Sequence, residues 1–372
     1  MLRKLAKPVT GGEPAGLSLF CYIGVNTMTK KTFASFEQQI QHLEDKGIII
    51  SDQSYAEAIL KQIGYFPLIG GYKHLFRIPF TKTYKTGTTF EEIVALYEFD
   101  SDLRDLFFKY LLQIERNLRS LMSYYFTEKY GESQDAYLDN SNYNANRRNQ
   151  KVVSRLISTL KYAANTTDYE FINYQRDTYG NIPLWVLVSV LTFGNLSKMY
   201  KVFPQSLQSK ICKNFGIINQ KQMEQFLSVL TKFRNVCAHS ERLFTYRTRD
   251  TISDLPLHRK LCIPMQGSQY QYGKNDLFAV VIVFRYLLPD KDFRLFKKRL
   301  AKSIDDVSEK LIVSAKYSCG FSNSQISPII VADRYFVYFT TIMEDRLWQV
   351  LAKPVFRWRN RSGLSMNAVR AA

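Results

Sequence analysis

The sequence predicts an all-α fold, and three observations support this class. Apolar residues recur at steps of three and four over long stretches, the clearest of which runs from Leu103 to Tyr125. Residues that cap or stop helices flank such stretches, as Asn219 and Gly131 do. The chain of 372 residues has 46% apolar residues but only 17 glycines and 11 prolines, which is typical of a compact body.

Residues 1–28 are expected to form a disordered extension. Prolines and glycines interrupt its short apolar part, so we expect no secretion signal. Met28 directly precedes the point where a regular helical pattern begins. The folded core is therefore predicted to start at residue 29.

Two short helices are predicted first, at residues 33–46 and 55–63, and each ends at a glycine. The aromatic and glycine-rich segment 64–80 is then predicted to be a packed loop or to contain a short strand. Thr88 and Glu91 have the spacing of a capping box, which opens the central helix that Gly131 ends.

Two acid–arginine pairs are spaced four residues apart along the central helix. These are Asp100 with Arg104 and Glu115 with Arg119. Side chains four apart meet on a helix surface, so both pairs are expected to form ion pairs. A structural role is favoured over a role near an active site.

The remaining helices follow from the same rules. Residues 182–200 are predicted to form one buried helix, because Pro183 suits a first turn and nearly every following residue is apolar. Further helices are predicted at 147–164, 205–214, from Asn219 onward, and at 276–288, 290–311 and 335–351. We expect a core of residues 29–249, a helical region 250–352 packed on it, and a mobile basic tail 353–372.

The net charge of +18 indicates a polyanionic partner. The basic residues cluster in two segments, around residues 147–161 and along one face of the helix at 290–311. We therefore expect RNA contacts from Arg147, Arg148, Lys151, Arg155, Arg294, Lys298 and Lys302. An excess of lysine that only keeps the protein soluble is the alternative.

The five cysteines are scattered, with no nearby histidines at metal-ligand spacing. We expect no disulfide framework, no metal and no cofactor, and a reducing cytoplasmic location. The longest apolar runs, 182–193 and 277–288, are too short to span a bilayer, so no membrane association is expected.

Residues 234–239, Arg-Asn-Val-Cys-Ala-His, are the stretch best equipped for chemistry. An arginine can hold a phosphate through paired donors, and an imidazole can move a proton near neutral pH. At about 100° per residue, Arg234 falls within the apolar stripe of its helix, so it is expected to be partly buried against a carboxylate, a carbonyl or a phosphate.

On a straight helix His239 would point about 140° away from Arg234. A shared site then requires a bend near Ala238 or a contribution from a second subunit. The alternative interpretation is a capping histidine and an ion-paired arginine without catalytic duty.

The segment 233–243 resembles the Arg-Asn-x-x-Ala-His-x-x-Arg-Leu signature of the Abi-like proteins, an abortive-infection phage-resistance family of the AbiD/AbiF type. The asparagine that usually follows the Arg-Leu pair is absent. Three further segments resemble the family in order: 36–50, 97–119, and the Pro-x-Trp and Phe-Gly-x-Leu-Ser elements at 183–197.

The resemblance implies a HEPN-like helical bundle and a metal-independent endoribonuclease that acts as a homodimer. Arg234 would neutralise the scissile phosphate, His239 would act as general acid or base, and Asn235 would orient either group. A phage component is the expected trigger, as in a toxin-type defence protein.

Two other functions remain open from the sequence. One is a non-catalytic protein that binds a small structured RNA, and the other is a regulatory scaffold that senses a phage protein.

Overall fold

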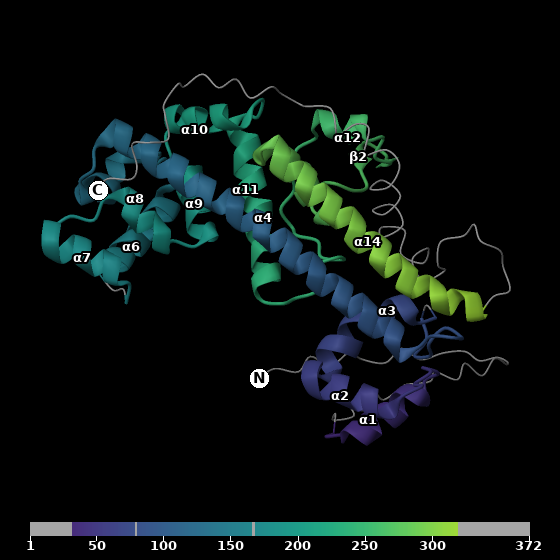
Figure 1. The fold of residues 1–372 in the computed structure, drawn as a ribbon. Helices are drawn as coiled ribbons and strands as arrows, with labels where there is room; N and C mark the ends of the chain where they lie inside the picture. The colour runs from purple at the N-terminus through teal and green to yellow at the C-terminus, as the bar shows by residue number, and fades with distance from the viewer. Residues whose placement is uncertain (1–31, 79, 166–167, 319–372) are drawn as a thin grey trace, which may run out of the picture.

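The computed structural model describes residues 32–78, 80–165 and 168–318 (Figure 1). The N-terminal half contains α1 (Phe36–Glu44), α2 (Gln53–Ile63), a π-helical turn (Phe66–Gly70), α3 (Gly71–Phe76), α4 (Phe90–Tyr130), α5 (Gln134–Leu138), a 3-10 turn (Asn140–Asn142), α6 (Gln150–Asn165) and α7 (Glu170–Tyr179). The remainder contains α8 (Leu184–Leu187), a 3-10 turn (Val188–Val190), α9 (Phe193–Val202), α10 (Gln205–Cys212), a 3-10 turn (Lys213–Phe215), α11 (Gln220–Ala238), α12 (Pro256–Lys260), β1 (Met265–Gln266), β2 (Gln269–Tyr270), α13 (Leu277–Leu287) and α14 (Asp290–Ser318). The predicted all-α class is confirmed.

The 41-residue helix α4 runs through the molecule, with α1–α3 at one end and α6–α8 at the other (Figure 1). The predicted capping box exists one residue later than expected. The Thr89 side chain accepts from the Glu92 amide at 3.2 Å, and Glu92 accepts from the Thr89 amide at 3.0 Å. Gly131 ends the helix with φ 86°, as predicted.

The prediction of a loop or strand at residues 64–80 is wrong, because most of this segment is helical. The π-turn and α3 bury Leu68, Ile69, Tyr72 and Phe76 in the core. This apolar burial outweighs the poor helix propensity of Gly70 and Gly71.

The prediction of one continuous helix at residues 182–200 is also wrong. Leu191 adopts an extended conformation with ψ 142°, and the Thr192 side chain caps α9 by accepting from the Asn195 amide. The break leaves the Leu191 carbonyl free of a helical partner, and Arg119 donates to it at 2.6 Å. A cap and a side-chain donor together replace the lost helical hydrogen bonds.

The C-terminal helices pack on α4. All of α13 except Tyr286 is buried, and α14 places Phe293, Phe296, Leu300 and related residues against α4. The Phe107 and Phe296 rings meet edge to face at 5.1 Å. Both helices were predicted.

One antiparallel pair of two-residue strands, β1 and β2, is the only sheet in the part of the chain that the structure describes. It lies after α12, where no strand was expected. Among these described residues no helix has the length and apolar character that a membrane span requires. The predicted extension 1–28, the helix at 335–351 and the basic tail lie outside the described residues.

Candidate functional site

The helix α11 brings the Arg-Asn-Val-Cys-Ala-His motif to the middle of α4. Asn219 and Gln222 form a reciprocal capping box at its start, with the Gln222 amide donating to Asn219 at 2.8 Å. Met223, Phe226, Leu227 and Leu230 are buried along one side, as the apolar pattern predicted. The helix packs against α4 and α9.

The helix ends inside the motif. Ser240 adopts φ 54°, the Glu241 amide donates to the Val236 carbonyl at 3.1 Å, and the Ser240 amide donates to the Cys237 carbonyl at 3.4 Å. This pair of bonds is a Schellman motif, which usually has glycine at the left-handed position. His239 is therefore the C-cap residue, and the helix ends at Ala238, where a bend was one of the two alternatives that the sequence left open.

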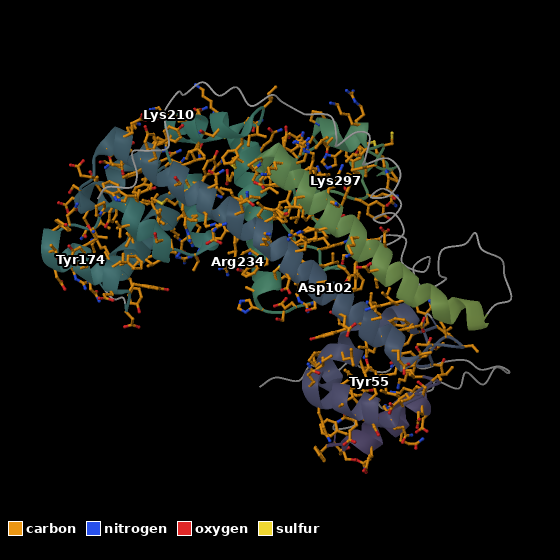
Figure 2. The ribbon with its side chains drawn as sticks, in the orientation of Figure 1. Tyr55, Asp102, Tyr174, Lys210, Arg234 and Lys297 are labelled. Atoms are coloured by element: carbon orange, nitrogen blue, oxygen red, sulfur yellow. The ribbon has the colours of Figure 1, made fainter. Side chains whose placement is uncertain are left out.

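Arg234 is partly buried, with 27% of its side chain exposed. Its Nε lies 3.6 Å from Oε2 of Glu115, and its guanidinium lies over the Phe108 ring at 5.7 Å. Of the three partners expected for this arginine, a carboxylate, a carbonyl or a phosphate, the structure shows the carboxylate. Figure 2 shows Arg234 beside α4, at the point where the C-terminal part of α11 passes α4.

Glu115 is shared by two arginines. Arg119 donates from Nη2 to Glu115 Oε1 at 2.5 Å, so the predicted pair within α4 exists. Glu115 is 2% exposed, yet its Oε2 and the facing Arg234 Nε are both buried without a hydrogen bond. Two guanidinium groups therefore share one carboxylate, Arg119 through a hydrogen bond and Arg234 through a longer ion pair, and an excess positive charge remains.

Asn235 and His239 lie on the exposed side of this helix end. They are four residues apart, so they share one face of α11, and the His239 amide donates to the Asn235 carbonyl at 2.9 Å. Solvent reaches both side chains. The arrangement offers an accessible imidazole and amide on the same helix end that carries the partly buried guanidinium of Arg234.

Cys237, which lies between these residues in the sequence, is not equipped as a nucleophile. It is buried, and burial raises the pKa of its thiol to about 12. Since the thiolate is the reactive form, this cysteine is inert near neutral pH.

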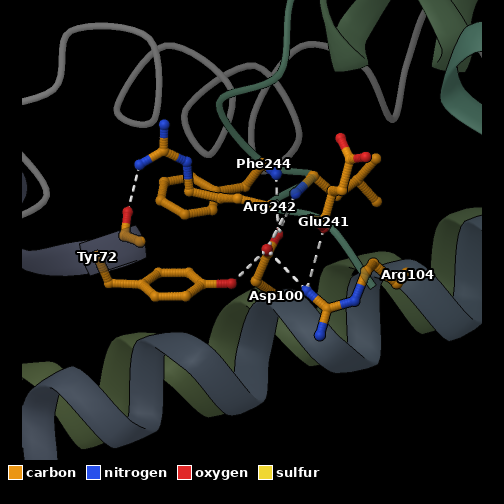
Figure 3. A network of polar contacts seen from close by, with 8 residues as sticks. Tyr72, Asp100, Arg104, Glu241, Arg242 and Phe244 are labelled. Carbon is orange, nitrogen blue, oxygen red and sulfur yellow. Dashed lines mark hydrogen bonds and ion pairs between the residues drawn. The ribbon is translucent and has the colours of Figure 1, made fainter. Parts of the chain in front are cut away.

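The residues after His239 are held by the carboxylate of Asp100 (Figure 3). Asp100 is fully buried and accepts from the Tyr72 hydroxyl at 2.7 Å, Arg104 Nη1 at 2.9 Å, the Leu243 amide at 2.9 Å and the Phe244 amide at 2.8 Å. Burial raises the pKa of the Asp100 carboxyl, while these donors favour its ionised form.

Two further contacts tie the same segment down. Arg242 donates to the Gly71 carbonyl at the start of α3, and Arg104 donates to the Glu241 carbonyl at 3.5 Å. The predicted Asp100–Arg104 pair therefore belongs to a network that joins α3, α4 and the end of the motif. The sequence indicated the pair but not the backbone that it binds.

The predicted RNA contacts do not form one patch. Arg147, Arg148, Lys151 and Arg155 are exposed at or near the start of α6, and Arg294, Lys298 and Lys302 are exposed along α14. Figure 1 places α6 at the α8 end of α4, while α14 runs along the other half. Neither set lies within the Arg234 site.

No cluster of three or more metal-ligating side chains occurs among the residues that the structure describes. Sequence reasoning missed one member of the site, since it paired Glu115 only with Arg119. The spacing within α4 was visible, but the contact between Glu115 and Arg234 joins two separate helices.

Comparison with known proteins gives one family match. A family model described as Abi-like protein matches residues 58–245, which include Asp100, Glu115 and the whole motif. No significant match is found among curated proteins or among solved structures.

Proposed function

The chain belongs to the Abi-like protein family, and from this premise we propose that it is an abortive-infection phage-defence protein that binds RNA and cleaves it without a metal. The proposal assigns the chemistry to Arg234 and His239, with Asn235 as the orienting residue, in a HEPN-like bundle. The family supports the defence role, and the site geometry supports the RNA chemistry.

A partly exposed guanidinium, held by Glu115 on the helix end that also carries His239, is the observation that carries the proposal. The Arg234 Nε faces Glu115 Oε2 at 3.6 Å, while 27% of the side chain stays exposed and can donate to a ligand. A phosphate oxygen is a suitable acceptor, because a guanidinium binds phosphate with charge-assisted hydrogen bonds. Glu115 fixes Arg234 in place, and Arg119 keeps the local charge positive.

The reaction follows from the groups available. The RNA 2′-hydroxyl attacks the neighbouring phosphorus as its proton passes to a base, and the 5′-oxygen leaves as it receives a proton from an acid. The products are a 2′,3′-cyclic phosphate and a free 5′-hydroxyl. Arg234 stabilises the charge that develops on the phosphate oxygens, and His239 transfers one of the protons.

The second proton transfer requires another group. Each chain contributes one accessible imidazole at this site, so we propose that a second copy supplies the other one in a homodimer. Exposure of Asn235 and His239 leaves that face open to a partner.

The test compares cleavage of a single-stranded RNA by the intact protein, His239→Ala, Arg234→Ala and Arg234→Lys, all with EDTA. The matched control is His42→Ala, which removes an exposed histidine at the end of α1. We expect a loss of at least about 100-fold for His239→Ala, since general acid–base catalysis contributes that much. Arg234→Lys should keep part of the activity.

RNA binding and host toxicity are measured in parallel. Products with a 2′,3′-cyclic end, and no cleavage of an RNA carrying 2′-deoxyribose at the cut position, are expected. Equal cleavage by all variants, or cleavage that EDTA abolishes, would contradict the proposal.

A non-catalytic protein that holds a small structured RNA is the second candidate. The exposed basic residues of α6 and α14 lie away from the motif, which favours binding over a large surface. In that case the intact protein and all variants bind RNA in a salt-dependent manner. None of them cleaves the RNA, and host toxicity is the same for all of them.

A further inference from the structure

A groove of about 320 Å³ lies between α6, α9 and α11, the helix that carries the motif. Its charged lining consists of Arg155 from α6, Lys198 and Lys201 from α9, Glu224 and Lys232 from α11, and Asp250 from the following segment. Four cations thus face two carboxylates. The groove carries positive charge where three helices converge.

The two carboxylates are already engaged. Glu224 forms an ion pair with Lys201 at 3.1 Å, and Asp250 accepts from the Ser228 hydroxyl at 2.8 Å. Arg155, Lys198 and Lys232 make no ion pair with any residue that the structure describes. These three exposed cations are available to an anion.

The floor of the groove is formed by small residues. Gly194 and Ser197 from the Phe-Gly-Asn-Leu-Ser segment line it together with Thr231, while Phe193 and Leu196 of that segment are buried in the core. A Cβ at Gly194 would lie 3.6 Å from Thr231 Cγ2, so a longer side chain would enter the groove. Glycine keeps this floor open.

The groove and His239 follow one face of α11. Ser228 and Thr231 line the groove, and steps of four residues lead from Thr231 to Asn235 and then to His239. At 1.5 Å per residue, Thr231 and His239 are about 12 Å apart along the helix axis. A stacked strand advances about 3.4 Å per nucleotide, so roughly three to four nucleotides span this distance.

We propose that this groove binds a backbone phosphate of the same RNA strand whose scissile phosphate lies at Arg234. The inference rests on the proposed function for the identity of its ligand. Arg155, Lys198 and Lys232 neutralise the phosphate, and the open floor at Gly194 admits the backbone. The groove thereby fixes where along the strand the cut falls.

The test uses the full chain with His239→Ala, which prevents cleavage, and a labelled single-stranded RNA of 12 nucleotides in EDTA. Lys198→Glu with Lys232→Glu is compared with Lys213→Glu with Lys260→Glu, two exposed lysines that do not line the groove. Both double variants change the net charge equally. Gly194→Leu fills the groove without changing charge, and thermal unfolding checks that each variant is folded.

We expect the groove variants to weaken RNA binding at least about fivefold more than the control pair and to reduce its salt dependence. In the active protein they should also shift the cut positions. Equal weakening by both charge pairs, together with no effect of Gly194→Leu, would overturn the inference.

Competition identifies the source of the phosphate. Inorganic phosphate and AMP should compete only weakly with RNA if the groove needs a strand, and strong binding of AMP without RNA binding would overturn the assignment to a strand. The two proposals fail separately. If His239→Ala abolishes cleavage but the groove variants bind RNA as before, only the groove proposal is rejected. If RNA binding depends on the groove but no RNA is cleaved, only the nuclease proposal is rejected.

Discussion

Two carboxylates of α4 hold the motif region, Glu115 at Arg234 and Asp100 just after His239, but their surroundings differ. Asp100 accepts hydrogen bonds from a hydroxyl, a guanidinium and two backbone amides, whereas one oxygen of Glu115 has no hydrogen bond. Both are buried and both pair with an arginine four residues on. The satisfied network of Asp100 holds the chain after His239 in place, while the Glu115 pair holds a guanidinium that stays partly exposed.

The largest expected effect comes from breaking the satisfied network. Asp100→Ala leaves Arg104, two amides and a hydroxyl without their acceptor, so we expect a loss of about 3–5 kcal/mol in the free energy of unfolding. Urea unfolding measures it. The control is Asp102→Ala, an exposed residue on the same helix, and a similar loss for both variants would contradict the structural role of Asp100.

The reactivity of the Cys237 thiol reports whether the motif is closed, that is, whether the Asp100 network holds the segment after His239 and keeps this thiol buried. With a pKa of about 12, it should react with a thiol reagent at pH 8 more than a hundredfold more slowly than the exposed Cys262, because so little thiolate is present. A variant in which the cysteines at positions 21, 212 and 319 are replaced by serine keeps the thiols of Cys237 and Cys262, so their two reactions can be measured separately. Asp100→Ala should accelerate the Cys237 reaction, and fast labelling in the intact network would argue against a closed motif.

Glu115→Gln should have a smaller effect on folding than Asp100→Ala. It keeps the shape and the hydrogen bond to Arg119 but removes the charge, so we expect a loss of about 1–2 kcal/mol by urea unfolding. Glu128→Gln, at an exposed ion pair with Lys210, should cost less than about 0.5 kcal/mol. The comparison fails if Glu115→Gln destabilises as much as Asp100→Ala.

The smallest effect is expected at Ser240. Its φ of 54° is unfavourable for a residue with a Cβ, so Ser240→Gly should stabilise the protein by about 0.5–1 kcal/mol. Thermal unfolding measures the change. A destabilisation would show that the serine side chain makes a contact that outweighs the backbone strain.

Local patterns predicted the helices that frame the site. The apolar steps in α4 and α11, Gly131 and the Asn219 cap are each visible in a few neighbouring residues. The failures arose where distant contacts decide the conformation. Burial against α4 makes residues 66–76 helical despite two glycines, and the Thr192 cap breaks an apolar run that looked continuous.

The same contrast holds for the site: most of its local features were predicted, and its contacts between distant residues were not. The angle of Arg234 within its helix predicted a buried partner, but no local spacing identified Glu115, which lies 119 residues earlier in the chain. The Schellman motif at Ser240 was likewise hidden, because serine is an unusual residue at that position.

The amide protons of Leu243 and Phe244 should exchange slowly with water, because the Asp100 network protects them. Both donate to a carboxylate that has no contact with solvent, so their protons can exchange with water only when the network opens. Hydrogen exchange at these two positions therefore measures the free energy that separates the closed motif from its open form. The exchange rates of two amide protons, four and five residues beyond His239, thus report how often that end of the motif opens.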